Sequence, residues 1–170
     1  NADCFRVDEG FATDLQAQYK FQTRRKRSVK KGRKNSYEIR QDENFSAYWN
    51  EVLTPTLQTR HDAEPVHTLE EIHLLRDRFP EQIQQWSAYD AQGQIQAGTM
   101  LFITPRVVHA QYIAGTQKGR AEGGIDLLFH QLITETFAHW RYFSFGIANE
   151  DQGQTLNQGL ADWKEGFGAR

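Results

Sequence analysis

Hydrophobic positions in the first half of the chain repeat with the period of an α-helix. The pattern predicts an amphipathic helix over residues 44–53, and Pro55 should kink or restart it. Its apolar face follows an i, i+4, i+7, i+8 spacing through Phe45, Trp49, Val52 and Leu53. Thr68 and Glu71 then have the spacing of a capping box, which predicts a second, short helix over residues 68–79.

A further helix is predicted ahead of these two, over residues 14–31. Asp14 is a suitable N-cap, basic residues crowd the last turns, where they interact favourably with the helix dipole, and Gly32 can end the helix. A short strand is predicted over residues 37–40. The first part of the chain is therefore expected to be mainly helical.

The pattern becomes that of extended chain after residue 82. Residues 83–89, 94–103 and 107–114 are typical of strands. The first two are joined by a four-residue turn that ends in Gly93, where a positive φ is wanted. Together the three segments predict an antiparallel meander.

The remainder of the chain predicts a β-α-β crossover. A polar, glycine-containing loop over residues 116–124 leads into an amphipathic helix over 125–139, a strand over 142–146 and a last helix over 155–164. The crossover helix should bring the strand 142–146 parallel to 107–114. The expected fold class is α/β with a mixed α+β sheet: an antiparallel meander followed by a β-α-β crossover, with flanking helices.

Length and composition fit one globular domain. The 170 residues are 38% hydrophobic and 12% aromatic, which suffices for one full-sized core. We expect a single domain over residues 16–170 and the remnant of a preceding region over residues 1–15. There is no run of 18 apolar residues, no leader of signal-peptide type, and only one cysteine, Cys4. These features favour a cytoplasmic protein without a membrane span or an internal disulfide.

Charge is distributed unevenly along the chain. Nine basic residues and no acidic residue lie between Lys20 and Lys34, so the rest of the chain carries −11 within a net charge of −2. Three interpretations are open: a solvated helix surface, a cover for acidic groups such as nucleotide phosphates, or a salt-sensitive RNA contact. Phe21 is the only aromatic residue in this segment, which argues against recognition by base stacking.

The order of these elements and their local motifs resemble a known family. The strand at 107–115, followed by the Arg-Ala-Glu-Gly-Gly-Ile run at 120–125, occupies the place of the acyl-CoA motif of the GNAT superfamily. The Phe-Gly turn within 142–147, the Lys-Glu-Gly-Phe-Gly run at 164–168 and the basic residues at 24–31 resemble its Fem-like branch more narrowly. The resemblance covers most of the chain and implies a GNAT-like fold with acyltransferase activity.

The loop before the long helix has the residue types of a pyrophosphate site. A helix N-terminus offers unpaired N–H groups and a partial positive charge, and glycines let the backbone approach a phosphate closely. The alternative is an ordinary helix start after a flexible turn. The cofactor-binding candidates in this stretch are Lys118, Gly119, Arg120, Gly123 and Gly124.

The strand before the loop carries further candidates. Direct attack of an amine on an acyl-CoA needs N–H groups that hold the donor and the developing oxyanion, which Ile113 and Ala114 would supply. By resemblance, Asn149 contacts the cofactor or the acceptor after the last strand. The candidates for proton transfer, and so for catalysis, are His109, Gln111, Tyr112 and Glu150.

Alternation along a strand assigns these side chains to faces. His109, Gln111 and Ile113 should share one face, and Ala110, Tyr112 and Ala114 should share the other. A polar His109/Gln111 face indicates the acceptor side of a site, and the alternative is a half-exposed structural strand. The six histidines show no metal-ligand spacing, so no metal is expected.

Three functions follow from the resemblance. The first is an N-acyltransferase that moves an acetyl or other acyl group from acetyl-CoA or another acyl-CoA to a small-molecule or peptide amine. The second is a Fem-type transferase that takes an aminoacyl group from a charged tRNA. The third is a domain that binds a ligand or partner without catalysis. A homodimer is left open.

Overall fold

The structure, a computed structural model, describes residues 8–150 and 153–170. Its strands are β1 (Gly10–Asp14), β2 (Glu38–Asp42), β3 (Ile83–Tyr89), β4 (Ile95–Ile103), β5 (Val107–Gly115), β6 (Tyr142–Ile147), β7 (Asn149–Glu150) and β8 (Thr155–Leu156). Six of them form one mixed sheet in the order β1-β6-β5-β4-β3-β2, and β7 pairs with β8. The sheet is antiparallel except between β5 and β6, which run parallel.

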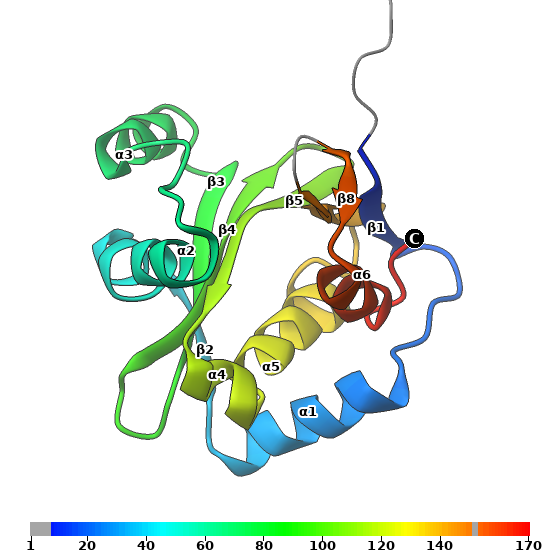
Figure 1. The fold of residues 1–170 in the computed structure, drawn as a ribbon. Coiled ribbons are helices and arrows are strands. Elements are labelled where there is room, and N and C mark those ends of the chain that lie inside the picture. The colour runs from blue at the N-terminus through cyan, green and yellow to red at the C-terminus, as the bar shows by residue number, and fades with distance from the viewer. Residues whose placement is uncertain (1–7, 151–152) are drawn as a thin grey trace, which may run out of the picture.

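Helices cover both faces of this sheet (Figure 1). They are α1 (Thr23–Lys34), the π-helix η1 (Tyr48–Leu53), α2 (Thr54–His61), α3 (Leu69–Arg78), α4 (Gln117–Glu122), α5 (Gly124–Gln131), the π-helix η2 (Leu132–Thr136) and α6 (Gln158–Glu165). One core, around Leu128 and Phe129, joins α1, α5, η2 and α6 to the sheet. The other, around Tyr48 and Ile72, joins η1 and α3 to the opposite face.

The parallel pair β5–β6 is short, and this shapes the centre of the molecule. Among the described residues, the two strands pair only between Val107–His109 and Tyr142–Ser144, although both continue further. Met100 and Leu101 of β4 pair with Tyr112 and Ala110, which leaves Gln111 between them without an opposite residue. Such a β-bulge bends and twists its strand, so it turns β5 away from β6.

Most predictions of fold are confirmed. The meander, the crossover and the parallel strand are all present, and so is the mixed sheet. The capping box is complete, because Glu71 N donates to Thr68 Oγ1 at 3.2 Å and Thr68 N donates to Glu71 Oε2 at 2.8 Å. Gly93 has a φ of +73°, and Pro55 lies in the first turn of α2, which therefore restarts there.

The prediction of a helix from Asp14 was wrong. Asp14 ends β1, where its Oδ1 accepts hydrogen bonds from the backbone of Gln16 and Ala17 and its Oδ2 accepts one from Arg141. Residues 10–14, expected in a preceding region, pair with β6 as an edge strand of the same sheet; residues 1–7 lie outside the described part. The helix begins at Thr23 and continues through Gly32 to Lys34.

Two further predictions were wrong in ways that affect the site. The segment 116–124 is not a loop, because Thr116 caps α4 by accepting a hydrogen bond from Gly119 N at 3.0 Å. The faces of β5 also differ from simple alternation. The bulge at Gln111 reverses them, so Ala110 packs in the core with α5 while Tyr112 packs in the core with η1.

Some element ends differ by a few residues. The crossover helix ends at Thr136 as η2 rather than near residue 139, and the last helix begins only after Asn157, whose Oδ1 accepts a hydrogen bond from Leu160 N. Within residues 8–150 and 153–170, no helix is long and apolar enough to cross a membrane.

Glycines allow α1 to lie directly on the start of α5. A Cβ on Gly32 would lie 2.5 Å from the carbonyl oxygen of Gly123, and a Cβ on Gly123 would lie 2.2 Å from that of Ser28. Gly124 packs under the ring of Tyr37 in the same way. Helix packing therefore occupies the backbone that the sequence suggested for phosphate binding.

We predict that Gly123→Ala destabilises the fold. Gly123 has a φ of +85°, where a side chain is strained, and the added methyl would collide with the Ser28 carbonyl, so the free energy of unfolding should fall by about 2 kcal/mol or more. Gly159→Ala is the control, because its nearest neighbour would be Asn157 Oδ1 at 3.7 Å. Urea denaturation measures both, and equal stability of the two variants would contradict this packing role.

Candidate functional site

A cavity of about 870 Å³ lies where β5 and β6 part. Residues of both strands line it, together with residues of α1, α2, α4, α5 and α6. A gap beside a strand whose partner has turned away leaves backbone polar groups that need other hydrogen-bond partners. The cavity is therefore both enclosed by helices and open to the edge of β5.

His109 enters this cavity from β5. Its Nδ1 lies 3.1 Å from Ser144 Oγ of β6, and a methyl group on Gly146 would lie 3.5 Å from its Cε1. Burial lowers the pKa of His109 below its usual 6.5; the neighbouring Gln111 opposes this shift and Lys164 adds to it. The imidazole is therefore neutral at pH 7 and able to accept a proton.

Lys164 enters the cavity from α6 and is only 2% exposed. Its Nζ donates hydrogen bonds to the carbonyl oxygens of Gly146, at 3.3 Å, and Ile147, at 2.5 Å. Burial lowers its pKa to about 8. His109 and Lys164 are thus neighbours across Gly146, one a neutral base and the other a buried ammonium donor.

A buried carboxylate holds three of the surrounding helices together. Asp126, in the first turn of α5, accepts hydrogen bonds from Arg25 and Ser28 of α1 and from Trp163 Nε1 of α6, the last at 2.9 Å. Arg25 and Asp126 form an ion pair that is nearly inaccessible to solvent. Removing either partner of such a pair leaves an uncompensated buried charge. The hydrogen bond from Trp163 ties α6, the helix that carries Lys164, to the same carboxylate.

Three arginines from different helices contribute positive charge to the cavity. They are Arg24 of α1, Arg60 of α2 and Arg120 of α4. Arg120 Nη1 donates to the carbonyl oxygen of Gly115, and its pKa is lowered by burial and by repulsion from Arg60. Within the described residues, none of the three takes part in an ion pair. The cavity therefore favours an anionic ligand.

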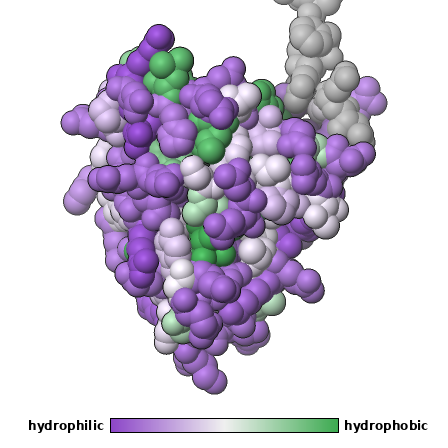
Figure 2. Space-filling view, turned by 90° about the vertical axis from the view of Figure 1, so that its left-hand side faces the viewer, coloured by the Kyte–Doolittle hydropathy of each residue, from purple (hydrophilic) through white to green (hydrophobic). Residues whose placement is uncertain are grey.

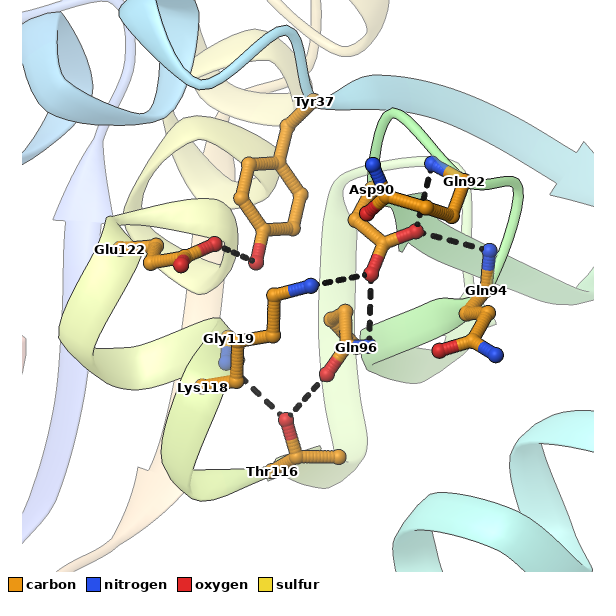
Figure 3. Close-up of polar contacts among 9 residues, drawn as sticks. All are labelled: Tyr37, Asp90, Gln92, Gln94, Gln96, Thr116, Lys118, Gly119 and Glu122. Carbon is orange, nitrogen blue, oxygen red and sulfur yellow. Dashed lines mark hydrogen bonds and ion pairs between the residues drawn. The ribbon is translucent and has the colours of Figure 1, made fainter.

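The predicted phosphate loop is engaged in contacts within the protein (Figure 3). Lys118 Nζ donates to Asp90 Oδ2 at 2.7 Å, which lowers the pKa of Asp90 to about 2. A Cβ on Gly119 would lie 2.2 Å from the carbonyl oxygen of Gln96. Lys118, Gly119, Gly123 and Gly124 thus lie outside the lining of the cavity, and of the five loop candidates only Arg120 belongs to it.

Of the remaining predicted site residues, some line the cavity and others lie outside it. Gln111, Ile113 and Ala114 line the cavity with His109. Tyr112 lies in the opposite core, where its Oη accepts a hydrogen bond from His67 N at 3.1 Å. Glu150 and Asn149 lie in β7, outside the lining of the cavity. Asn157 Nδ2 donates to Glu150 Oε1 at 2.7 Å, and Glu9 N donates to Asn149 Oδ1 at 2.6 Å.

Sequence reasoning missed Lys164, Asp126, Arg24 and Arg60 as site residues. Lys164 belongs to the Lys-Glu-Gly-Phe-Gly run, so its motif was visible, but a lysine near a helix end is usually solvated. Asp126 carried a weaker signal, as an acidic residue among the apolar residues of the first turns of α5. No group of three or more His, Cys, Asp or Glu side chains suited to a metal ion occurs in the part of the chain that the structure describes.

The lowered pKa of Lys164 predicts a pH dependence of stability. Between pH 8 and the ordinary lysine value of 10.5, the unfolded chain holds this proton and the folded chain does not, so the free energy of unfolding rises with pH. The rise should be on the order of 3 kcal/mol across the window. Denaturation of the wild type and of Lys164→Met at pH values from 7 to 10 isolates the contribution of Lys164 to this rise. A difference in the free energy of unfolding between the two proteins that stays constant with pH would contradict the prediction.

Comparison with known proteins gives matches at the level of structure. No protein-family model and no curated protein sequence matches the chain. A crystal structure of FemX superposes with a TM-score of 0.75 at 10% identity, over 97% of this chain and 60% of that one. The C-terminal domain of a putative lysylphosphatidylglycerol synthetase from Agrobacterium fabrum gives 0.68 at 14% identity, over 98% of this chain and 58% of that one.

A third match, L-PGS from Bacillus licheniformis, has a TM-score of 0.65 at 12% identity and covers 98% of this chain and 58% of that one. The chain thus spans about three fifths of the length of these proteins. At such low identities the matches concern the fold alone. The chain has the GNAT-like, Fem-like acyltransferase fold that the sequence predicts.

Proposed function

We propose that this chain is an acyltransferase domain that transfers an acyl group to an amine in the cavity between β5 and β6. The observation that carries the proposal is the pair of neighbours His109 and Lys164, a neutral base and a buried ammonium placed beside a parted strand. An acyl transfer needs both kinds of group, one to accept a proton and one to stabilise negative charge.

The proposed reaction is a direct attack. The amine nitrogen bonds to the acyl carbonyl carbon, and the carbonyl electrons move to the oxygen, giving a tetrahedral oxyanion. The oxyanion then collapses, which breaks the bond between the carbon and the leaving oxygen or sulfur. The proton lost by the amine passes to His109, which returns it to the leaving oxygen or sulfur, so that the leaving group departs as an alcohol or thiol.

Lys164 has the position and charge to stabilise the oxyanion. Its ammonium is held by the carbonyl oxygens of Gly146 and Ile147, so it is oriented before the substrate arrives. Donors fixed in a water-poor site are worth far more than the same donors in water. Since the pKa of Lys164 is about 8, most of the molecules carry the charge at pH 7.

We favour an aminoacyl-tRNA as the donor over an acyl-CoA. The glycines and Lys118 of the expected pyrophosphate loop are occupied by Gln96, α1 and Asp90, which leaves little room for a pyrophosphate at the start of α5. Arg24, Arg60 and Arg120 offer a separate place for a phosphate. One structural match is called a lysylphosphatidylglycerol synthetase, a name that describes the attachment of an amino acid.

Acetyl-CoA or another acyl-CoA is the second candidate donor. The same three arginines could hold its phosphates, and the edge of β5 at Ile113 and Ala114 lines the cavity as a CoA arm would require. In either case the acceptor is a small-molecule or peptide amine. A domain that binds such ligands without catalysis is the third alternative, and transfer assays separate the three.

We predict that Lys164→Met and His109→Gln each lower the transfer rate by about 100-fold, because each removes a group that acts in the transition state. Transfer of radiolabel from mixed aminoacyl-tRNA to a panel of amines measures the rate under single-turnover conditions. Glu165→Gln is the control: it follows Lys164 but is exposed and lies outside the cavity, so its rate should stay within about twofold of the wild type.

The outcomes separate the alternatives. Full rates in both cavity variants would contradict the assigned roles. Thiol release from acetyl-CoA without any transfer from aminoacyl-tRNA would contradict the preferred donor and support the second candidate. If the wild type transfers from neither donor, the chain is a binding domain and the catalytic proposal fails.

A further inference from the structure

A second cavity, of about 680 Å³, lies on the other side of α1. It is formed by α1, the segment that precedes it, the end of α5 and η2. Four cationic side chains line it: Lys20, Lys26, Lys30 and Arg33. No acidic residue contributes to its lining, and none of these cations forms an ion pair among the described residues.

Aromatic rings form the inner wall of this cavity. Phe21 meets His130 edge to face, with 5.6 Å between ring centroids, and Tyr19 lies 5.8 Å from Phe21. Burial raises the pKa of Tyr19 and lowers that of His130, so both rings are uncharged at pH 7. In the sequence Phe21 is the only aromatic residue within the basic segment, and Tyr19 directly precedes that segment; the fold brings His130 beside Phe21.

We propose that this cavity binds a nucleotide of a single-stranded RNA segment, with its base against the aromatic wall and its phosphates on the lysines of α1. Sequence-tolerant binding of single-stranded nucleic acid combines a basic groove with aromatic rings on which bases stack. The proposal rests on the preferred donor, a charged tRNA, and assigns it a docking surface outside the reaction cavity.

Helix α1 connects the two cavities. Arg24, Arg25 and Ser28 line the reaction cavity, whereas Lys26 and Lys30 line the second one. The helix has 12 residues, so its length is about 18 Å. A tRNA whose aminoacylated end lies in the reaction cavity can therefore continue around α1. Its next unpaired nucleotides then reach the second cavity.

A membrane surface would also attract these lysines, but the apolar contacts that it needs are missing from this face. The large apolar side chains that stand out from the described surface are Val66, Leu74, Phe79, Ile147, Leu156 and Leu160, and none belongs to α1. The face that carries α2 and α3 shows such apolar patches among hydrophilic side chains (Figure 2). The rings beside α1 are recessed, as a base-binding pocket requires.

Fluorescence anisotropy with labelled, unfractionated tRNA between 50 and 200 mM KCl tests the proposal. The double variant Lys26→Gln, Lys30→Gln should bind about tenfold more weakly, and the slope of log affinity against log salt should shrink by about 1.4, because two phosphate contacts are lost. Phe21→Leu should weaken binding about tenfold with an unchanged slope, since a stacking contact is lost.

The matched control is Lys31→Gln, Lys34→Gln, which removes the same charge from the same helix but outside the cavity. It should bind within about threefold of the wild type. Equal weakening by both double variants, or preference for phosphatidylglycerol vesicles over tRNA, overturns the proposal. Lys164→Met should keep its tRNA affinity, so lost binding reports on this surface and lost transfer reports on the proposed function.

Discussion

The short pairing of β5 with β6 is the constraint on which the rest of the molecule depends. The strands pair over three residues and then part, and the bulge at Gln111 accounts for the change of direction. Backbone groups beyond the parting need partners from elsewhere. Lys164 provides two of these hydrogen bonds, to Gly146 and Ile147, so the need to satisfy β6 explains why a lysine is buried here. The feature that opens the cavity therefore also brings a charge into it.

Helix α1 forms one wall of the cavity. Its contact with α5 depends on Gly32 and Gly123, and its ion pair with Asp126 reaches the base of the cavity. The same contacts cover the helix start that would otherwise hold a pyrophosphate. This supports a donor whose phosphates are held by side chains.

The sequence predicts those parts of the fold that local chemistry decides. Thr68 and Glu71 cap a helix through each other, and Gly93 takes the positive φ of its turn, so both could be identified from neighbouring residues alone. Asp14 could not, because its carboxylate pairs with Arg141, which is 127 residues away. The side chain of Asp14 does accept hydrogen bonds from the backbone that follows it, as an N-cap would. Its pairing with Arg141 and its place at the end of an edge strand nevertheless exclude a helix there.

The candidate site shows the same limit. His109 was identifiable because a polar residue on an apolar strand is unusual, whereas Lys164 becomes significant only through its burial against β6. The faces of the sheet on which Tyr112 and Ala110 lie depend on the bulge at Gln111, and no residue type in the sequence predicts that bulge. Likewise, His130 joins Phe21 only in the folded chain. Tertiary contacts, rather than composition, made these residues candidates.

A crystal structure with a stable amide analogue of a 3′-aminoacyl-adenosine would show whether Lys164 contacts the reacting carbonyl. On the proposed function, the acyl carbonyl oxygen lies within hydrogen-bond distance, about 3 Å, of Lys164 Nζ, with His109 on the side from which an amine approaches. A parallel structure with coenzyme A serves as the comparison. An analogue bound outside the cavity, or a pyrophosphate bound at the start of α5 between Gly119 and Gly124, would contradict it.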